Sequence, residues 1–470
     1  MPSSPDFSAI AERHLVRIAR LEPHLKAFAL LEPEWLRRRA WEQARAAGPL
    51  HPVLGGLTLG VKDLLDLRGL PTGGGSARPH VGEAPADAAA VSALAGAGML
   101  ALGKTHTVEL AFGTWGVNRA TATPRNPWDA GTVRVPGGSS SGSAVAVAAG
   151  LADAALGTDT GGSIRIPAAL NNITGIRPTI GRVSRRGCLP LSPSLDTVGP
   201  MARDIKVAAH MLQAMAGHDP ADPATALAPT GPKPGPYDAA AALVRPVKGM
   251  RLAVLGDHAL EGVSDAMGDA YLAACAVLER QGARLVEVRP VLPLPACIEP
   301  SGLLMAAEAW RIWRERLDHY EGEMDKGVAA RLRQGENVTD TELSRLLQNR
   351  RQDQQRFHAW LEEVDALLTP TLALAAPALA DLDEGRLPFS RFVRAANWLD
   401  LPAVALPCGA TREGLPLSLQ VLALPWREAV AVGVAARYQQ ATDWHQRRPD
   451  LEALVKAATV PAPAAGSRPA

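Results

Sequence analysis

Short apolar segments of strand length alternate along this chain with longer amphipathic or charged segments, and this alternation constrains its fold more than any other feature. Strands that are apolar throughout must be covered on both faces. The order therefore predicts an α/β protein with a mostly buried mixed sheet. The predicted strands lie within 54–66, before Gly103, and at 152–157, 251–257, 366–376 and 402–407; the predicted helices lie within 6–48, 86–96, 144–150, 264–282 and 302–365.

Composition changes at two places. Residues 217–247 are dominated by proline and alanine, which predicts a surface linker or long insertion between a first part, 50–205, and a second part, 248–459. The proline- and alanine-rich tail 460–470 is expected to be disordered.

Charge and cysteine content exclude several classes of protein. The 49 basic and 48 acidic side chains leave a formal net charge of +1, so no long-range field gathers nucleic acid or an anionic membrane. The four cysteines form no CxxC pair, which argues against a zinc or thioredoxin-type site and favours free thiols in a reducing cytoplasm. No secretory signal or membrane-spanning segment is apparent. We therefore expect a cytoplasmic protein without nucleic-acid or membrane partners.

Two glycine- and serine-rich segments, 137–143 and 157–167, each lie beside an apolar small-residue segment. Glycine allows positive φ and close backbone approach, so successive N–H groups in such turns can converge on an oxyanion. A serine at the end of such a turn is placed to act as a nucleophile. A flexible Gly/Ser loop explains the same composition equally well.

A serine nucleophile needs a base, and Lys62 is a candidate because it lies in the apolar segment 57–65. Burial can lower a lysine pKa from about 10.4 towards 7, which would let the neutral amine accept a proton. The alternatives are an ion pair between Lys62 and Asp63, or a side chain that reaches solvent. The chain also has 11 histidines, although none lies close in sequence to the serine segments.

Common motifs do not explain the serine segments. Residues 138–142 match GxSxG, but a long loop rather than a strand precedes them. No lysine follows a serine by three positions, as SxxK enzymes require. The segments also lack the phosphate-binding patterns GxxxxGK[ST] and GxGxxG.

The combination of segments closely resembles the amidase-signature family. The resemblance rests on VKDLLDLRGLPTGGGS (61–76), PGGSSSGSAVAVAAG (136–150) and GTDTGGSIRIPAALNNITGIRPT (157–179), with support from 196–203 and from Gly414-Leu415-Pro416 to Gln420. It covers roughly residues 50–435. It implies one domain over 1–459, with a central mixed twisted β-sheet covered by helices on both faces.

The resemblance also implies a Ser–cis-Ser–Lys triad that needs no metal or cofactor. Ser163 would attack the substrate carbonyl and form an acyl-enzyme, Ser139 would bridge, and Lys62 would be the base. Water would then hydrolyse the acyl-enzyme. The oxyanion hole would comprise the backbone N–H groups of Thr160, Gly161, Gly162 and Ser163; the supporting residues would be Ser140, Thr158, Asp159 and Arg165, the last two as an ion pair that stiffens the loop.

Three positions differ from the family pattern or invite a specific role. Asp400 stands where glycine is common in the family. Trp115 and Trp398 are candidates for the wall of an aromatic-accepting pocket, although tryptophans more often pack in cores.

Three functions are compatible with these residues. The first is a stand-alone amidohydrolase that acts on a small amide, urea or carbamate, or on an ester. The second is the amidase component of a glutamyl-tRNA(Gln) amidotransferase-type complex, and the third is a catalytically silent binding protein of the same fold. The base rate among soluble enzymes favours a homodimer.

Overall fold

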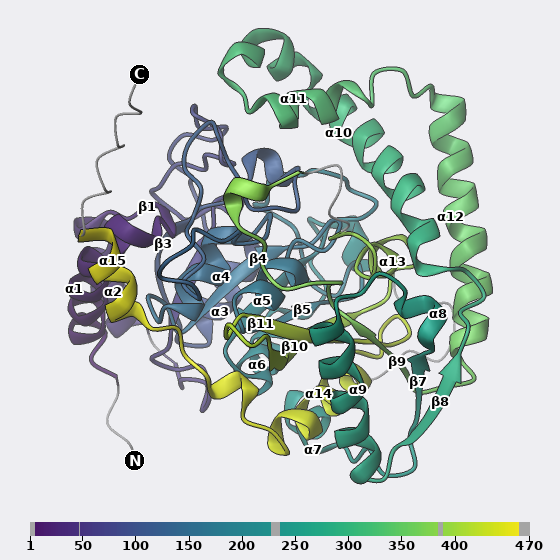
Figure 1. Ribbon diagram of the computed structural model, residues 1–470. Helices are drawn as coiled ribbons and strands as arrows, with labels where there is room; N and C mark the ends of the chain where they lie inside the picture. The colour runs from purple at the N-terminus through teal and green to yellow at the C-terminus, as the bar shows by residue number, and fades with distance from the viewer. Residues whose placement is uncertain (1–4, 47, 227–235, 384–388, 460–470) are drawn as a thin grey trace, which may run out of the picture.

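The computed structural model describes residues 5–46, 48–226, 236–383 and 389–459. Its strands form one 11-stranded sheet in the order β1-β3-β2-β4-β6-β5-β10-β11-β9-β7-β8 (Figure 1). The strands are β1 Phe28–Leu30, β2 Thr58–Lys62, β3 Leu100–Thr105, β4 Ala154–Thr158, β5 Thr174–Arg177, β6 Val198–Ala202, β7 Arg251–Leu255, β8 Arg284–Val288, β9 Ala366–Pro370, β10 Ala403–Ala410 and β11 Pro416–Leu422.

The sheet is mixed, which confirms the predicted fold class. β2 pairs in parallel with β3 and β4, and β7 pairs in parallel with β8 and β9, whereas the other pairings are antiparallel. Strands from both sides of residues 217–247 therefore belong to the same sheet. The helices are α1 Phe7–Leu25, α2 Pro33–Arg45, α3 Ala89–Gly96, α4 Ser141–Ala148, α5 Arg165–Leu170, α6 Ile205–Met215, α7 Ala239–Val244, α8 Asp257–Leu260, α9 Asp265–Arg280, α10 Ile298–Tyr320, α11 Lys326–Arg333, α12 Asp340–Leu361, α13 Arg394–Trp398, α14 Glu428–Gln440 and α15 Leu451–Thr459.

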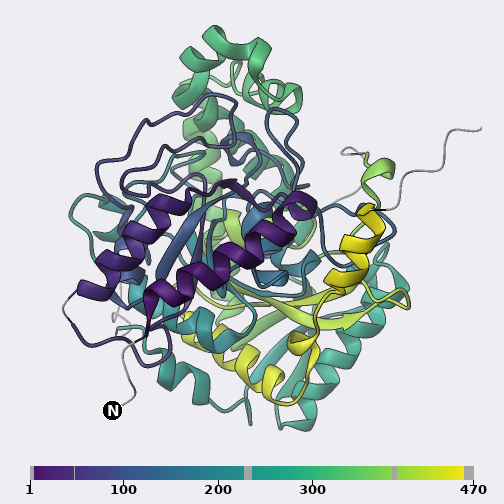
Figure 2. The same ribbon diagram turned by 90° about the vertical axis from the view of Figure 1, so that its left-hand side faces the viewer.

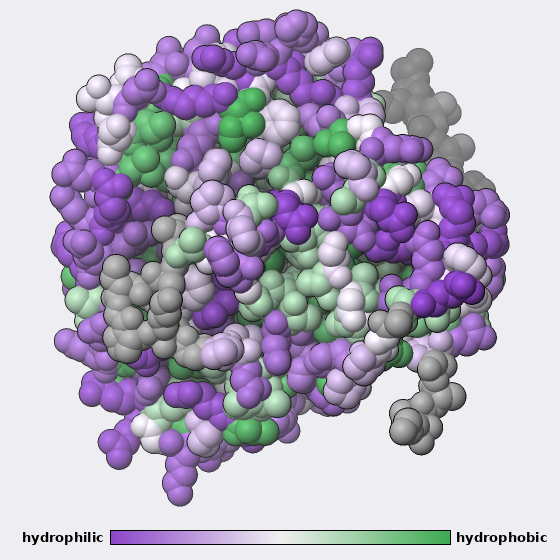
Figure 3. Space-filling model, turned by 180° about the vertical axis from the view of Figure 1, so that it is seen from behind, coloured by the Kyte–Doolittle hydropathy of each residue, from purple (hydrophilic) through white to green (hydrophobic). Residues whose placement is uncertain are grey.

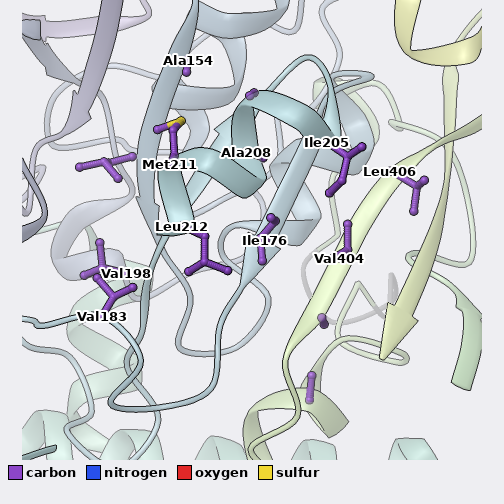
Figure 4. Close-up of a cluster of buried hydrophobic side chains, with 14 of the residues drawn as sticks. Ala154, Ile176, Val183, Val198, Ile205, Ala208, Met211, Leu212, Val404 and Leu406 are labelled. Carbon is purple, nitrogen blue, oxygen red and sulfur yellow. The ribbon is translucent and has the colours of Figure 1, made fainter. Parts of the chain in front are cut away.

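Neighbouring residues of β4 show that helices cover both faces of the sheet. Ala154 belongs to the same core cluster as Met211 of α6 (Figure 4). Ala155 belongs to a separate cluster with Ala144 of α4 and Ala168 of α5. Because successive side chains of a strand point to opposite faces, α6 covers one face and the pair α4 and α5 covers the other.

The first two helices and the last helix lie at one side of the molecule, away from the long helices of its second half. α1, α2 and α15 gather at one side, and α10 and α12 line the opposite side (Figures 1 and 2). Hydrophilic residues cover most of the face seen from behind, with apolar residues gathered near its middle (Figure 3). None of the helices in the described residues combines the length and the apolar character that a membrane span requires.

Several predicted elements differ from those observed. The region 6–48 is not continuously helical, because α1 ends at Leu25 and β1 pairs with β3 before α2 begins. The second half of the proline- and alanine-rich segment contains α7, whose Ala239 and Ala242 are buried. The residues 227–235 of that segment and the tail 460–470 lie outside the described residues. The four cysteines are free, as predicted.

Candidate active site

Lys62 is the last residue of β2, a central strand between β3 and β4, and its side chain is fully buried. Its Nζ donates to Ser139 Oγ and to Thr158 Oγ1, each at 2.7 Å. The alternative pairing with Asp63 is wrong, because Asp63 forms an ion pair with Lys104 at 2.8 Å on the neighbouring strand. The β2 segment therefore carries its amine to two hydroxyl groups rather than to a carboxylate.

This environment favours the uncharged form of the lysine. Removal of the ammonium from water lowers the pKa of Lys62 to about 7, and the charges of the more distant Cys188, Asp159 and Asp196 offset only part of this effect. A substantial fraction of the amine is then neutral at physiological pH, so it can accept a proton.

Ser139 lies in the loop before α4, and the peptide bond that precedes it is cis. The next residue, Ser140, joins this loop to the second glycine-rich segment: its backbone N–H donates to the Ser163 carbonyl at 3.2 Å. Its hydroxyl donates to the Thr158 carbonyl and accepts from the Thr158 N–H, both at 3.3 Å. These contacts bring Lys62, Ser139, Ser140 and Thr158 together, beside the backbone of Ser163.

Ser163 ends a turn that a buried carboxylate organises from inside. Asp159 Oδ1 accepts from the Gly162 N–H at 2.7 Å, and Asp159 Oδ2 accepts from the Ile164 N–H at 3.2 Å. Gly162 has φ of +108°, a conformation that a side chain would disfavour. The Gly162 N–H is thus directed at Asp159, which leaves Thr160, Gly161 and Ser163 as the candidate oxyanion donors. The described residues include no hydrogen bond to Ser163 Oγ.

The predicted ion pair between Asp159 and Arg165 is present and fully buried. Arg165 Nε and Nη2 donate to the two carboxylate oxygens at 3.0 Å each. Burial alone would raise the pKa of Asp159, but the Arg165 guanidinium outweighs it and holds the pKa well below its ordinary range. The turn that carries Ser163 is therefore stiffened by a permanent ion pair.

Two further residues hold this ion pair. Arg165 also donates to Gln420 Oε1 and to Asn397 Oδ1, both at 2.7 Å, and Asn397 Nδ2 donates to Asp159 Oδ1 at 2.8 Å. Sequence reasoning assigned no role to Asn397 or Gln420, although Gln420 ends the family-like segment 414–420. One signal could have identified them: each is an amide side chain in an apolar segment, and a buried amide needs a hydrogen-bond partner.

Ser163 opens into a cavity of about 370 Å3. Trp115 lines this cavity, and its ring packs against that of Phe389, with 4.3 Å between centroids and the planes tilted by 41°. Trp398 does not line it: its ring is fully buried, and its indole N–H donates to Asp353 Oδ2 at 2.8 Å. The cavity also contains residues that the sequence did not single out, namely Met305, Arg331 and Arg394.

The described residues contain no group of three or more His, Cys, Asp or Glu side chains that could hold a metal ion. The polar side chains that line the cavity beside Ser163 carry hydroxyl groups, on Thr114 and Thr160, or guanidinium groups, on Arg331 and Arg394.

Comparison with known proteins identifies the relatives of this arrangement. Residues 9–431 match the profile of the family described as Amidase. This chain belongs to the amidase family. It is 37% identical over 473 residues to a glutamyl-tRNA(Gln) amidotransferase subunit from Chloroflexus aggregans, with 94% of each chain covered.

Solved structures of amidase-family enzymes share the fold. Native peptide amidase from Stenotrophomonas maltophilia matches with a TM-score of 0.80 and 31% identity, over 94% of this chain and 95% of that one. The 6-aminohexanoate cyclic dimer hydrolase bound to its substrate matches with a TM-score of 0.83 and 25% identity, over 95% of each chain. Family membership makes this chain an enzyme that hydrolyses C–N bonds.

The structure explains how this amidase accommodates Asp400 where the family commonly has glycine. Asp400 has φ of +55°, in the left-handed region that glycine adopts without cost. Aspartate tolerates this region better than most residues. Its carboxylate also accepts from the Ile180 N–H at 3.0 Å and pairs with Arg177 at 3.4 Å.

Proposed function

We propose that this chain hydrolyses a carbonyl C–N bond of a small amide through an acyl-Ser163 intermediate, with Ser139 as the bridge and Lys62 as the general base. Ureas, carbamates and esters present the same type of carbonyl. The observation that carries the proposal is a fully buried amine that contacts two hydroxyl groups and has a pKa of about 7. A structural lysine would instead be expected to pair with a carboxylate, as Lys104 does.

The proposed proton path uses the hydrogen bond between Lys62 Nζ and Ser139 Oγ. Neutral Lys62 accepts the proton of Ser139 as Ser139 accepts that of Ser163, and Ser163 Oγ attacks the carbonyl carbon. The proton returns through Ser139 to the leaving nitrogen as the C–N bond breaks and the acyl-enzyme forms. Water then attacks the ester, loses its proton along the same path and releases the acid.

The developing oxyanion would be held by backbone N–H groups of the turn before Ser163. The candidate donors are the N–H groups of Thr160, Gly161 and Ser163. The Gly162 N–H is not among them, because it already donates to Asp159. The buried pair of Asp159 and Arg165 keeps the turn in place before substrate binds, so little reorganisation accompanies the reaction.

Wild type and Ser163→Ala distinguish this proposal from a silent binding protein. Wild type should react with a fluorophosphonate probe, and it should release ammonia or amine from a panel of amides, ureas and carbamates and an alcohol from esters. Mass spectrometry should detect the acyl adduct on the peptide that contains Ser163. Labelling or turnover that persists in Ser163→Ala would remove this serine as the nucleophile.

A second candidate is the corresponding component of a glutamyl-tRNA(Gln) amidotransferase, which the 37% identity over 94% of each chain favours. In that function the same serine would attack the side-chain amide of glutamine. Glutamine hydrolysis that requires added partner chains would support this candidate. Hydrolysis of other amides by the purified chain alone would support a stand-alone amidase, as the likeness to peptide amidase does.

A further inference from the structure

Arg394 lies at the start of α13 and contacts the turn that carries Ser163. A methyl group placed on Gly161 would lie 2.7 Å from Arg394 Cζ, so the guanidinium packs directly against this glycine. Both residues line the cavity into which Ser163 opens. A group bound by Arg394 would therefore belong to the molecule that Ser163 attacks.

The guanidinium of Arg394 has few protein partners. Among the described residues it forms no ion pair, and its hydrogen bonds are long: Nε to Ser390 Oγ at 3.4 Å and Nη1 to Met305 Sδ at 4.0 Å. Arg165 offers a direct contrast, because its guanidinium is fully used by Asp159, Asn397, Gln420 and a backbone carbonyl.

The charge of Arg394 persists despite its partly buried position. Burial lowers the pKa of Arg394 to about 10, and the Asp159 carboxylate offsets part of this effect, so the side chain remains a cation at neutral pH. A second guanidinium, that of Arg331, lines the same cavity and donates from Nε to the Phe112 carbonyl at 2.7 Å. Within the described ranges of the chain, no aspartate or glutamate lines this cavity.

An arginine with free donors in a concave site is suited to a planar anion, because its fork of N–H groups matches the two oxygens of a carboxylate. The remaining walls include Trp115 and Met305, which can cover an apolar connecting chain. We propose that Arg394 binds a carboxylate of the substrate, so that this enzyme selects amides that also carry a carboxylate group. This inference rests on the proposed function, because Ser163 must be the residue that attacks the same molecule.

Matched pairs of substrates test the selection. Succinamate and butyramide differ by a carboxylate in place of a methyl group, and glutaramate and valeramide form a second pair with a longer chain. A charge-assisted hydrogen bond predicts a kcat/KM for the better acid that is about tenfold to a hundredfold that of its neutral partner. The rate of ammonia release at a series of substrate concentrations gives kcat and KM for each substrate.

Arg394→Gln should reduce the ratio of kcat/KM for the acid to kcat/KM for its neutral partner to about three or less, mainly through a higher KM for the acid. Arg394→Lys should restore part of this ratio. Arg391→Gln is the matched control. Arg391 lies three residues earlier, donates to the carbonyls of Ala259 and Glu261, and does not line the cavity, so its loss should leave the ratio as in wild type. Thermal unfolding of each variant checks that it folds.

Two outcomes would overturn the inference while the proposed function stands. One is equal kcat/KM for the acid and neutral members of both pairs. The other is an Arg394→Gln variant whose kcat falls by the same factor for both members, because Arg394 would then act on the reacting carbonyl. Failure of Ser163→Ala to stop hydrolysis would instead contradict the proposed function.

Binding tests Arg394 independently of turnover. Glutarate should bind the Ser163→Ala variant in isothermal titration. The double variant with Ser163→Ala and Arg394→Gln should bind glutarate at least tenfold more weakly. Equal affinity in the two proteins, or no binding of glutarate to either, would show that Arg394 does not hold a carboxylate.

Discussion

Replacement of Lys62 by methionine tests the buried amine on which the proposed mechanism depends. The change keeps an unbranched side chain of similar length but removes the amine and its hydrogen bonds to Ser139 and Thr158. Catalysis should fall by several orders of magnitude at neutral pH, because no group remains to accept the proton of Ser139. The more specific consequence concerns the dependence of stability on pH.

The magnitude follows from the pKa of this lysine. A fall from the ordinary value of 10.5 to about 7 means that burial of the ammonium costs the folded state about 5 kcal/mol at pH 7 and below. Between pH 7 and 10.5 the unfolded chain holds one more proton at this residue than the folded chain does. The free energy of unfolding of wild type therefore gains about 1.4 kcal/mol per pH unit from Lys62 in this window.

Methionine cannot contribute this dependence. The free energy of unfolding of Lys62→Met minus that of wild type should therefore fall by about 2.7 kcal/mol between pH 7.5 and pH 9.5. The hydrogen bonds lost with the amine shift this difference by a constant and leave its slope unchanged. Urea unfolding at a series of pH values measures the slope, and Lys206→Met, at an exposed position of α6, controls for the loss of a lysine.

Parallel stability curves for wild type and Lys62→Met would refute the reasoning, because the amine would then keep its proton in the folded protein. The kinetic counterpart is measured on wild type: kcat/KM should fall about tenfold per pH unit below pH 7, as Lys62 becomes protonated. A profile that stays flat from pH 5 to pH 9 would contradict the assignment of Lys62 as base.

Three further changes test other parts of the site. Asp159→Asn should destabilise the protein by about 3–5 kcal/mol in thermal unfolding and reduce turnover, because the buried Arg165 loses its charged partner; an unchanged midpoint would contradict this. Asp400→Val should cost at least about 1–2 kcal/mol more than Asp400→Gly, because only glycine relieves the positive φ; equal stabilities would count against strain there. Trp115→Leu should reorder KM values across acyl groups of different size, whereas Trp398→Phe, outside the cavity, should preserve the wild-type order.

Much of the fold could be predicted because its signals are local. The strands around residues 58–62, 251–255 and 366–370 are short apolar runs, and the helices within 302–365 form long, charged segments, so both were recognised. β1 was missed because three residues between two helices carry no periodic signal, and it is stabilised by pairing with β3. α7 was missed because its alanine-rich segment resembles a linker until its buried face is known.

The sequence by itself determined the candidate chemistry, since the two serine segments and a lysine in an apolar strand, together with the resemblance to the amidase signature, predict a nucleophile, a bridge and a base. Only the tertiary structure decided how these groups are used. It directed Lys62 to hydroxyl groups instead of Asp63, committed the Gly162 N–H to Asp159, and removed Trp398 from the cavity. These outcomes depend on contacts between residues far apart in the chain, for which the local pattern of amino acids carries no information.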